Sequence, residues 1–252
     1  MANELYFCEL PLYNDSKQRR EGSNKMAKKM SLAQRINVLR AIVMGANDGI
    51  ISVAGIVIGV AAATSNSYSI LISGLSGSLA GTISMCMGEY VSVSTQKDSQ
   101  RMALVEEKER LAEDPQGEFN YVKQKYMDQD ISEDLAQKAT KELMDKDAMG
   151  TAVQERYGFN PNEFTSPYAA ALSSFISFPL GSILPMVAVT TFPPATRIIA
   201  TVIAVLIALV ITGYIAAVLG NNPNKLKSVI RNTVSGLLTM AVTFLIGQLL
   251  KR

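Results

Sequence analysis

A-I-V-M-G-A-N-D-G-I-I-S-V-A-G-I-V-I-G-V-A-A-A-T, residues 41–64, is the stretch that decides the fold class. It contains no charged residue except Asp48. About 20 apolar residues in an α-helix, which rises about 1.5 Å per residue, cover the ~30 Å hydrocarbon core of a bilayer. The stretch therefore predicts a transmembrane helix that carries one carboxylate inside the membrane.

Four further stretches have the same apolar character: residues 69–94, 168–189, 198–220 and 233–250. The second of them contains Pro179 and Pro185, which either break the helix or only bend it. The whole chain is 48% hydrophobic with a mean hydropathy of +0.17, which is unusual for a soluble domain. We therefore expect an all-α integral membrane protein with five transmembrane helices.

Charge is concentrated between the second and third apolar stretches. Residues 97–163 hold 16 of the 22 acidic residues and 10 basic ones, a net charge of −6. Good helix formers continue to Glu113, so we expect the second membrane helix to extend beyond the bilayer until Pro115 ends it. Further helices are expected near residues 118–127 and from Ser132.

The helix that begins at Ser132 would bury a stripe made by Leu135, Ala139 and Leu143, which recur every four residues. The domains expected from these patterns are a polar basic N-terminal arm (1–34), transmembrane helices 1 and 2 (35–95), a cytoplasmic acidic helical domain (96–165) and transmembrane helices 3 to 5 (166–252).

Basic residues set the expected orientation. The residues before position 41 include eight basic and four acidic ones, and the loop after the fourth apolar stretch contains Lys225, Lys227 and Arg231. The first loop, residues 65–68, carries no charge. By the positive-inside rule, the N-terminus, the acidic domain and the last loop would face the cytoplasm, and the C-terminus the opposite side.

The polar N-terminal residues do not predict a cleavable signal peptide.

Two residue types restrict the possible chemistry. The chain has no histidine, which is the commonest zinc ligand and proton shuttle. Its two cysteines, Cys8 and Cys86, do not indicate a disulfide framework. Any metal or proton chemistry must therefore use carboxylates, carbonyls, hydroxyls or sulfur.

Asp48 lies about seven residues into the first membrane helix, roughly 10 Å below the cytoplasmic surface. A carboxylate at that depth is costly and usually functional. Four small residues share its helix face: Gly45, Ser52, Gly55 and Gly59. Another helix can approach such a narrow polar face closely. The alternative is a packing seam of small residues that tolerates one aspartate.

The second membrane helix carries Gly77, Gly81, Met85 and Glu89 four residues apart on one face. Met85 would lie at a depth similar to Asp48, and Glu89 one turn nearer the cytoplasm. Carboxylate oxygen suits divalent ions and thioether sulfur favours softer transition metals, so these faces predict a path for Fe²⁺ or Mn²⁺. The alternatives are a lipid-facing methionine and a glutamate that reaches interfacial water.

A further set of glutamates follows on the predicted extension of this helix. Glu106, Glu109 and Glu113 form a stripe, and Glu107 lies beside it. Such a stripe is usually a solvated face. It becomes a candidate for metal capture only because it continues a membrane helix that carries Glu89.

Three motifs carry a resemblance to a known family: G-A-N-D-G (45–49), S-M-C-M-G-E-Y-V-S-V-S (84–94) and F-I-S-F-P-L-G-S-I-L-P (175–185). With them, the chain from about Arg35 onward resembles the vacuolar iron transporter family. The resemblance implies a homodimer of five-helix subunits that exports cytosolic Fe²⁺, and often Mn²⁺, in exchange for protons. It implies a path between the first two helices of both subunits, with Asp48, Met85 and Glu89 at the family's membrane positions.

In the acidic domain the resemblance implies glutamates that gather metal. Glu107 and Glu118 keep the family's positions, whereas Arg110 and Tyr121 stand where their partner glutamates would be. Arg110 can pair with Glu107 at helical spacing, so we expect weak metal binding by this domain. The third group of the pattern is replaced by Ala152, Val153 and Arg156. Three glutamates could compensate: Glu106, Glu109 and Glu155.

With what the resemblance implies, these patterns predict a proton-coupled exporter of divalent transition metal, and not an enzyme. Asp48 would exchange ion and proton, Met85 would bind the desolvated ion, and Glu89 would pass ions from the cytoplasmic side. We expect no cofactor, since the metal is cargo, and no nucleic-acid partner. The membrane would be the plasma membrane in a bacterium and a vacuolar-type membrane in a eukaryote. The alternative is a non-transporting, metal-responsive membrane regulator or scaffold with the same fold.

Overall fold

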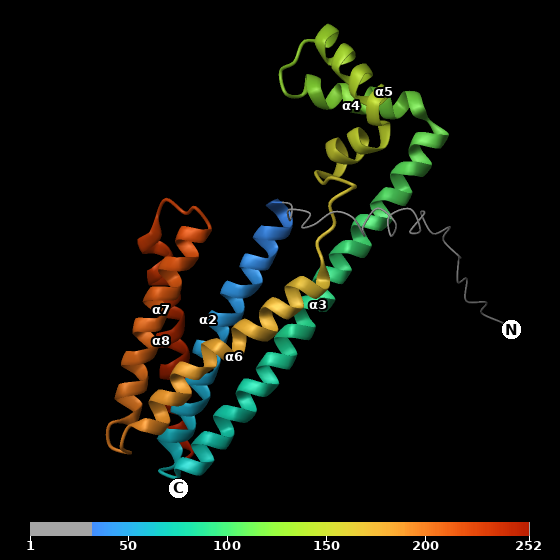
Figure 1. The fold of residues 1–252 in the computed structure, drawn as a ribbon. Coiled ribbons are helices and arrows are strands. Elements are labelled where there is room, and N and C mark those ends of the chain that lie inside the picture. The colour runs from blue at the N-terminus through green and yellow to red at the C-terminus, as the bar shows by residue number, and fades with distance from the viewer. Residues whose placement is uncertain (1–31, 252) are drawn as a thin grey trace, which may run out of the picture. The chain divides into compact units, whose positions relative to one another are not determined.

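Helices make up most of residues 32–251, the part of the chain that the computed structural model describes. The expected N-terminal arm lies outside this part, except for residues 32–34. Figure 1 shows the seven described helices: α2 (Leu32–Ala63), α3 (Ser67–Glu113), α4 (Pro115–Met127), α5 (Glu133–Tyr157), α6 (Pro167–Thr191), α7 (Arg197–Leu219) and α8 (Lys225–Leu249).

Five of these helices, namely α2, α3, α6, α7 and α8, are long and apolar enough to cross a membrane. The described residues contain no strand. The prediction of an all-α membrane protein is therefore confirmed. α3 continues without interruption to Glu113, as expected, so its last turns lie well beyond the apolar stretch that ends at residue 94.

Asp114 and Pro115 fix the junction between α3 and α4. A residue that precedes proline is disfavoured in helical conformation, and Asp114 has φ −139° and ψ 75°. Its carboxylate then accepts a hydrogen bond from the backbone N–H of Gly117 at 2.8 Å, which caps the start of α4. The same short sequence therefore ends one helix and begins the next.

The predicted buried stripe of α5 is wrong. Leu135 is 59% exposed and Leu143 is 43% exposed, whereas Ala136 and Thr140 are buried. α5 packs against α4 and α3, and these smaller side chains are the ones it buries. A shift of one residue turns a helix face by about 100°, so the large apolar side chains point away from the contact.

α2 contacts the other four membrane-length helices. A Cβ atom on Gly45 would overlap the side chain of Ser177, and one on Gly49 would overlap the carbonyl oxygen of Phe178, both in α6. Two further glycines of α2, Gly55 and Gly59, lie against threonines of α8. The small-residue face predicted for α2 is thus divided between two neighbouring helices.

α6 is one continuous helix that includes both of its internal prolines, Pro179 and Pro185. The alternative in which the prolines break α6 into two helices is therefore wrong. α6 also approaches α2 closely at Gly181, whose Cβ position would overlap the carbonyl oxygen of Ala46. Backbone-to-backbone contact of this kind fixes how the two helices cross.

Candidate functional site

A pocket of about 420 Å³ lies between α2 and α3. Asp48 and Ser52 line it from α2, and Met85 lines it from α3. The other lining residues are Ile56, Gly77, Ala80, Gly81, Ser84 and Phe178. The structure therefore brings the predicted carboxylate and thioether to the same pocket, within the apolar stretches of both helices.

The Asp48 carboxylate is held by its own helix but is not enclosed by the residues that the structure describes. The Ser52 hydroxyl, one turn further on, donates a hydrogen bond of 2.5 Å to Asp48 Oδ1. Asp48 is nevertheless exposed. A carboxylate that faces hydrocarbon is costly, so Asp48 requires water, a cation or another protein surface beside it.

The small residues of α3 shape the other wall of this pocket. A Cβ atom on Gly77 would overlap the Ile56 side chain, and one on Gly81 would overlap the ring of Phe178. Met85, one turn later, packs against the apolar cluster that contains Phe178. Met85 is thus held from the protein side while it borders the pocket, so it is not simply a lipid-facing methionine.

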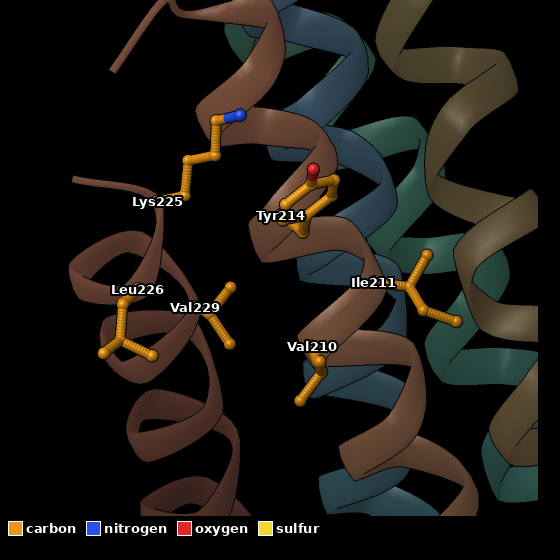
Figure 2. A pocket seen from close by; sticks show the side chains of 6 residues that line it. All are labelled: Val210, Ile211, Tyr214, Lys225, Leu226 and Val229. Atoms are coloured by element: carbon orange, nitrogen blue, oxygen red, sulfur yellow. The ribbon is translucent and has the colours of Figure 1, made fainter. Parts of the chain in front are cut away.

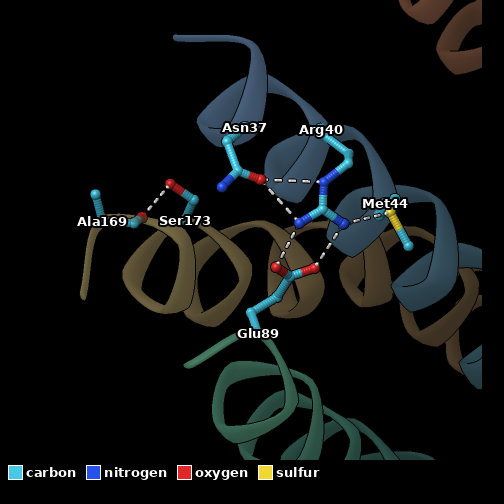
Figure 3. Close-up of polar contacts among 6 residues, drawn as sticks. All are labelled: Asn37, Arg40, Met44, Glu89, Ala169 and Ser173. Atoms are coloured by element: carbon cyan, nitrogen blue, oxygen red, sulfur yellow. Dashed lines mark hydrogen bonds and ion pairs between the residues drawn. The ribbon is translucent and has the colours of Figure 1, made fainter. Parts of the chain in front are cut away.

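Glu89 does not line this pocket but is paired with Arg40 of α2 (Figure 3). Arg40 Nη1 donates to Glu89 Oε1 at 3.2 Å, and Arg40 Nη2 donates to Glu89 Oε2 at 2.9 Å. The Glu89 side chain is only 8% exposed and that of Arg40 is 43% exposed. Glu89 is therefore a buried, neutralised carboxylate and not a side chain that reaches into water.

Beyond the apolar part of α3, Arg156 of α5 brings Glu107 and Glu118 together. Arg156 Nε lies 2.9 Å from Glu107 Oε2, and Arg156 Nη2 donates to Glu118 Oε2 at 2.5 Å. The guanidinium also stacks on Tyr121, with its carbon 3.7 Å from the ring centroid. A cation of the chain itself is therefore paired with both carboxylates.

One guanidinium does not fully satisfy the two carboxylates. Glu107 is fully buried, and neither of its carboxylate oxygens has an aligned hydrogen bond within the described residues. Glu107 lies ~20 Å of helix beyond residue 94, outside the membrane-spanning stretch. Burial raises the pKa of Glu107 above its usual value, neighbouring Glu118 raises it further, and Arg156 opposes both effects.

The remaining glutamates predicted for metal capture do not join this pair. Glu106 and Glu109 are exposed, and Glu155 accepts a hydrogen bond of 2.9 Å from the Tyr126 hydroxyl. Burial and this contact raise the pKa of Tyr126 to about 12. Within residues 34–251, no group of three or more acidic, cysteine or histidine side chains could hold a metal ion. Weak metal binding by this domain stays a prediction, and the cation that pairs with Glu107 is Arg156 and not Arg110.

A second pocket, of about 520 Å³, lies between α7 and α8 (Figure 2). Its lining residues are Val210, Ile211, Tyr214, Lys225, Leu226 and Val229. Although it is larger, it offers a cation no carboxylate or sulfur, and its one charged residue, Lys225, is positive and lies over the Tyr214 ring at 5.5 Å. We therefore place the functional site between α2 and α3.

The sequence pattern of the VIT family matches residues 39–248. This chain belongs to the VIT family. Three similar VIT-family relatives are a vacuolar iron transporter of Acanthamoeba castellanii (34% identity, 84% of this chain and 78% of the relative), vacuolar iron transporter homolog 4 of Arabidopsis thaliana (31%, 84% and 83%) and vacuolar iron transporter homolog 1 of Oryza sativa subsp. japonica (33%, 83% and 72%).

Three residues around Glu89 were not predicted from the sequence of this VIT-family chain. Asn37, Arg40 and Met44 lie at i, i+3 and i+7 on one face of α2, and all three contact one another through the Arg40 guanidinium. The spacing was visible in the sequence. This spacing did not indicate a functional site, because charged residues are common where a helix leaves the membrane.

Proposed function

We propose that this VIT-family chain exports divalent transition metal ions, Fe²⁺ or Mn²⁺, from the cytosol in exchange for protons. The main support is the pocket in which the Asp48 carboxylate and the Met85 thioether border the same space. Oxygen and sulfur together suit these ions better than Mg²⁺, which prefers oxygen alone. The names of the relatives, vacuolar iron transporters, also support a metal as cargo.

In this proposal, Asp48 exchanges one cation for another. It is the single carboxylate in the apolar stretch of α2, so a bound metal ion and a bound proton compete for the same oxygens. The Ser52 hydroxyl holds one carboxylate oxygen in place whichever cation is present. Met85 replaces part of the water that a desolvated metal ion loses.

We further propose that the transporter is a homodimer. Asp48 is exposed on the single chain, beside the small residues Ala80 and Ser84 of α3, which are also exposed. Small residues allow another helix to approach closely in a membrane. A second copy placed over this face would enclose the pocket and remove the carboxylate from contact with lipid.

Reconstitution in vesicles tests this function. The purified chain is placed in liposomes that contain a Mn²⁺-sensitive dye or a pH-sensitive dye, and Mn²⁺ is added outside. We expect Mn²⁺ to enter faster than in empty vesicles, with proton movement in the opposite direction. Folded protein that moves neither Mn²⁺ nor Fe²⁺ would eliminate the transporter function.

The second candidate function is a non-transporting metal-responsive regulator or scaffold. The observation in its favour is that Arg40 and Arg156 are already paired with Glu89, Glu107 and Glu118. A chain of this kind would bind Mn²⁺ at Asp48 without moving it across the bilayer. The vesicle experiment separates the two candidates, because binding alone does not fill the vesicle interior.

A further inference from the structure

The Arg40 guanidinium lies among four possible metal-binding atoms from three residues (Figure 3). Two are the oxygens of Glu89, at 3.2 and 2.9 Å. The third is Asn37 Oδ1, which accepts hydrogen bonds from Arg40 Nε at 3.2 Å and Nη2 at 2.9 Å. The fourth is the sulfur of Met44, 3.4 Å from Arg40 Nη1. A carboxylate, an amide oxygen and a thioether thus surround one positive charge.

This set of atoms suits a transition metal ion better than it suits a guanidinium. Sulfur is a weak hydrogen-bond acceptor, so Met44 contributes little to holding Arg40. Carboxylate oxygen, amide oxygen and thioether sulfur are all ligands of divalent metals, and the sulfur favours the softer ones. The combination repeats the chemistry of the pocket that Asp48 and Met85 border, roughly 12 Å further along α2 from Arg40.

The two charged partners differ in how freely they can leave. The Arg40 side chain is 43% exposed, and its long stem allows the guanidinium to move into water. The Glu89 side chain is 8% exposed and would be left as an unpaired buried charge, which is strongly unfavourable. The pair therefore opens readily only when another cation takes the place of the guanidinium.

Arg156 provides a contrast within the same chain. Its side chain is 18% exposed, it contacts two carboxylates, and it stacks on Tyr121. No sulfur or amide oxygen is among these contacts. Arg156 thus has the contacts of a permanent structural cation, whereas Arg40 has those of a cation that can be exchanged.

We propose that Asn37, Met44 and Glu89 form a second binding site for a divalent transition metal ion, which Arg40 occupies until the metal displaces it. The site lies on the side of the Asp48 pocket where cytosolic ions arrive under the proposed function, on which this inference rests for its place in transport. When no metal ion is bound, Arg40 balances the negative charge of Glu89. It also competes for the same ligand atoms with ions that bind only weakly.

Binding of Mn²⁺ to the detergent-solubilised full chain tests the proposal, with free Mn²⁺ counted by electron paramagnetic resonance. All variants carry Asp48→Asn, so that the neighbouring pocket does not contribute. Arg40→Gln should tighten Mn²⁺ binding about tenfold, because the metal no longer displaces charge-assisted hydrogen bonds. Arg40→Lys keeps the charge but loses the two-pronged contact. Its affinity for Mn²⁺ should lie between that of the protein with Arg40 and that of Arg40→Gln. The matched control is Arg35→Gln. Arg35 is an exposed arginine of the same helix, and its replacement should leave the affinity for Mn²⁺ unchanged.

Two additions to Arg40→Gln identify the ligands. Glu89→Gln should abolish the gained binding, and Met44→Leu should remove most of it. Unchanged or weaker Mn²⁺ binding in both folded Arg40 variants would overturn the proposal, as would a gain that survives Glu89→Gln. Because this readout requires no transport, it is independent of the vesicle experiment: a wild-type chain without flux contradicts the transporter function and leaves the binding result intact.

Discussion

At the scale of single residues, Met85 gives the sharpest test of how the pocket selects its ion. Met85→Leu keeps the size and the packing against Phe178 but removes the sulfur. Transport of Fe²⁺ or Mn²⁺ should fall roughly tenfold, the effect of losing about 1.4 kcal/mol of binding. The free energy of unfolding should change by less than ~1.5 kcal/mol.

Met87→Leu is the matched control for this substitution. Met87 is exposed on the same helix, two residues further on, and is not among the pocket residues. Flux in vesicles and thermal unfolding of both variants provide the comparison. If Met85→Leu transports as well as Met87→Leu, sulfur does not contribute to ion binding.

Residues of this site differ in how predictable they are. Asp48 could be found from the sequence because a carboxylate is conspicuous in an apolar stretch. The pairing of Glu89 with Arg40 could not, because the two lie 49 positions apart and only the packing of α2 against α3 brings them together. The same holds for Arg156, whose partner Glu118 is 38 positions away.

At the scale of elements, the contact between α2 and α6 depends on a glycine. Gly49→Ala would push a methyl group into the backbone of Phe178, so the two helices must separate. We expect a loss of ~1–3 kcal/mol in stability, which outweighs the helix propensity gained. Gly88→Ala is the control, since a Cβ there meets nothing within 4 Å, and it should be neutral or stabilising. Thermal unfolding measures both, and equal stability of the two variants would contradict the close packing.

The meeting point of α3, α4 and α5 gives a second prediction at this scale. Arg156→Glu replaces the internal cation with a third carboxylate beside Glu107 and Glu118. The full chain should then bind one additional Mn²⁺ and should be less stable when Mn²⁺ is removed, because three carboxylates repel one another.

The number of bound Mn²⁺ ions, measured by equilibrium dialysis, tests this prediction. Arg110→Glu adds the same charge at an exposed position and should add no site. If the wild-type chain already binds a metal ion through Glu107 and Glu118, the assignment of Arg156 as a structural cation is wrong.

Element boundaries were more predictable than element faces. Long apolar runs and Pro115 indicate where α2 ends and where α3 begins and ends, and both are local properties of the sequence. The start of α2 was less predictable, because the helix begins at Leu32, nine residues before its apolar run. The buried face of α5 depends on which neighbour it meets, and that contact selects Ala136 and Thr140 over larger leucines. α5 also changes direction at Asp147, where φ is −155°, and this interrupts any single stripe.

At the scale of the whole molecule, the helix connections predict a topology. Arg197 Nη2 donates to Ser67 Oγ at 3.2 Å, so the loop before α7 lies beside the turn before α3. Lys225, Lys227 and Arg231 were expected in the loop before α8 but lie in its first two turns. Their positive charges favour the cytoplasm for this end of α8, opposite the loop before α7. In a chain whose cysteines are replaced, we expect Lys251→Cys to react with a membrane-impermeant reagent only from the non-cytoplasmic side. Lys141→Cys should react only from the cytoplasmic side, and labelling of both positions from one side would contradict five spans.

In the proposed function, metal ions cross the membrane through the pocket at Asp48. Asp48→Asn preserves size and the contact with Ser52 but removes the charge that a metal ion or proton requires. Asp98→Asn, at an exposed position of α3, is the matched control. The most direct test is Mn²⁺ flux into vesicles that contain equal amounts of folded wild-type, Asp48→Asn and Asp98→Asn protein. We predict flux at the empty-vesicle level for Asp48→Asn and wild-type flux for Asp98→Asn; wild-type flux in Asp48→Asn would contradict the account.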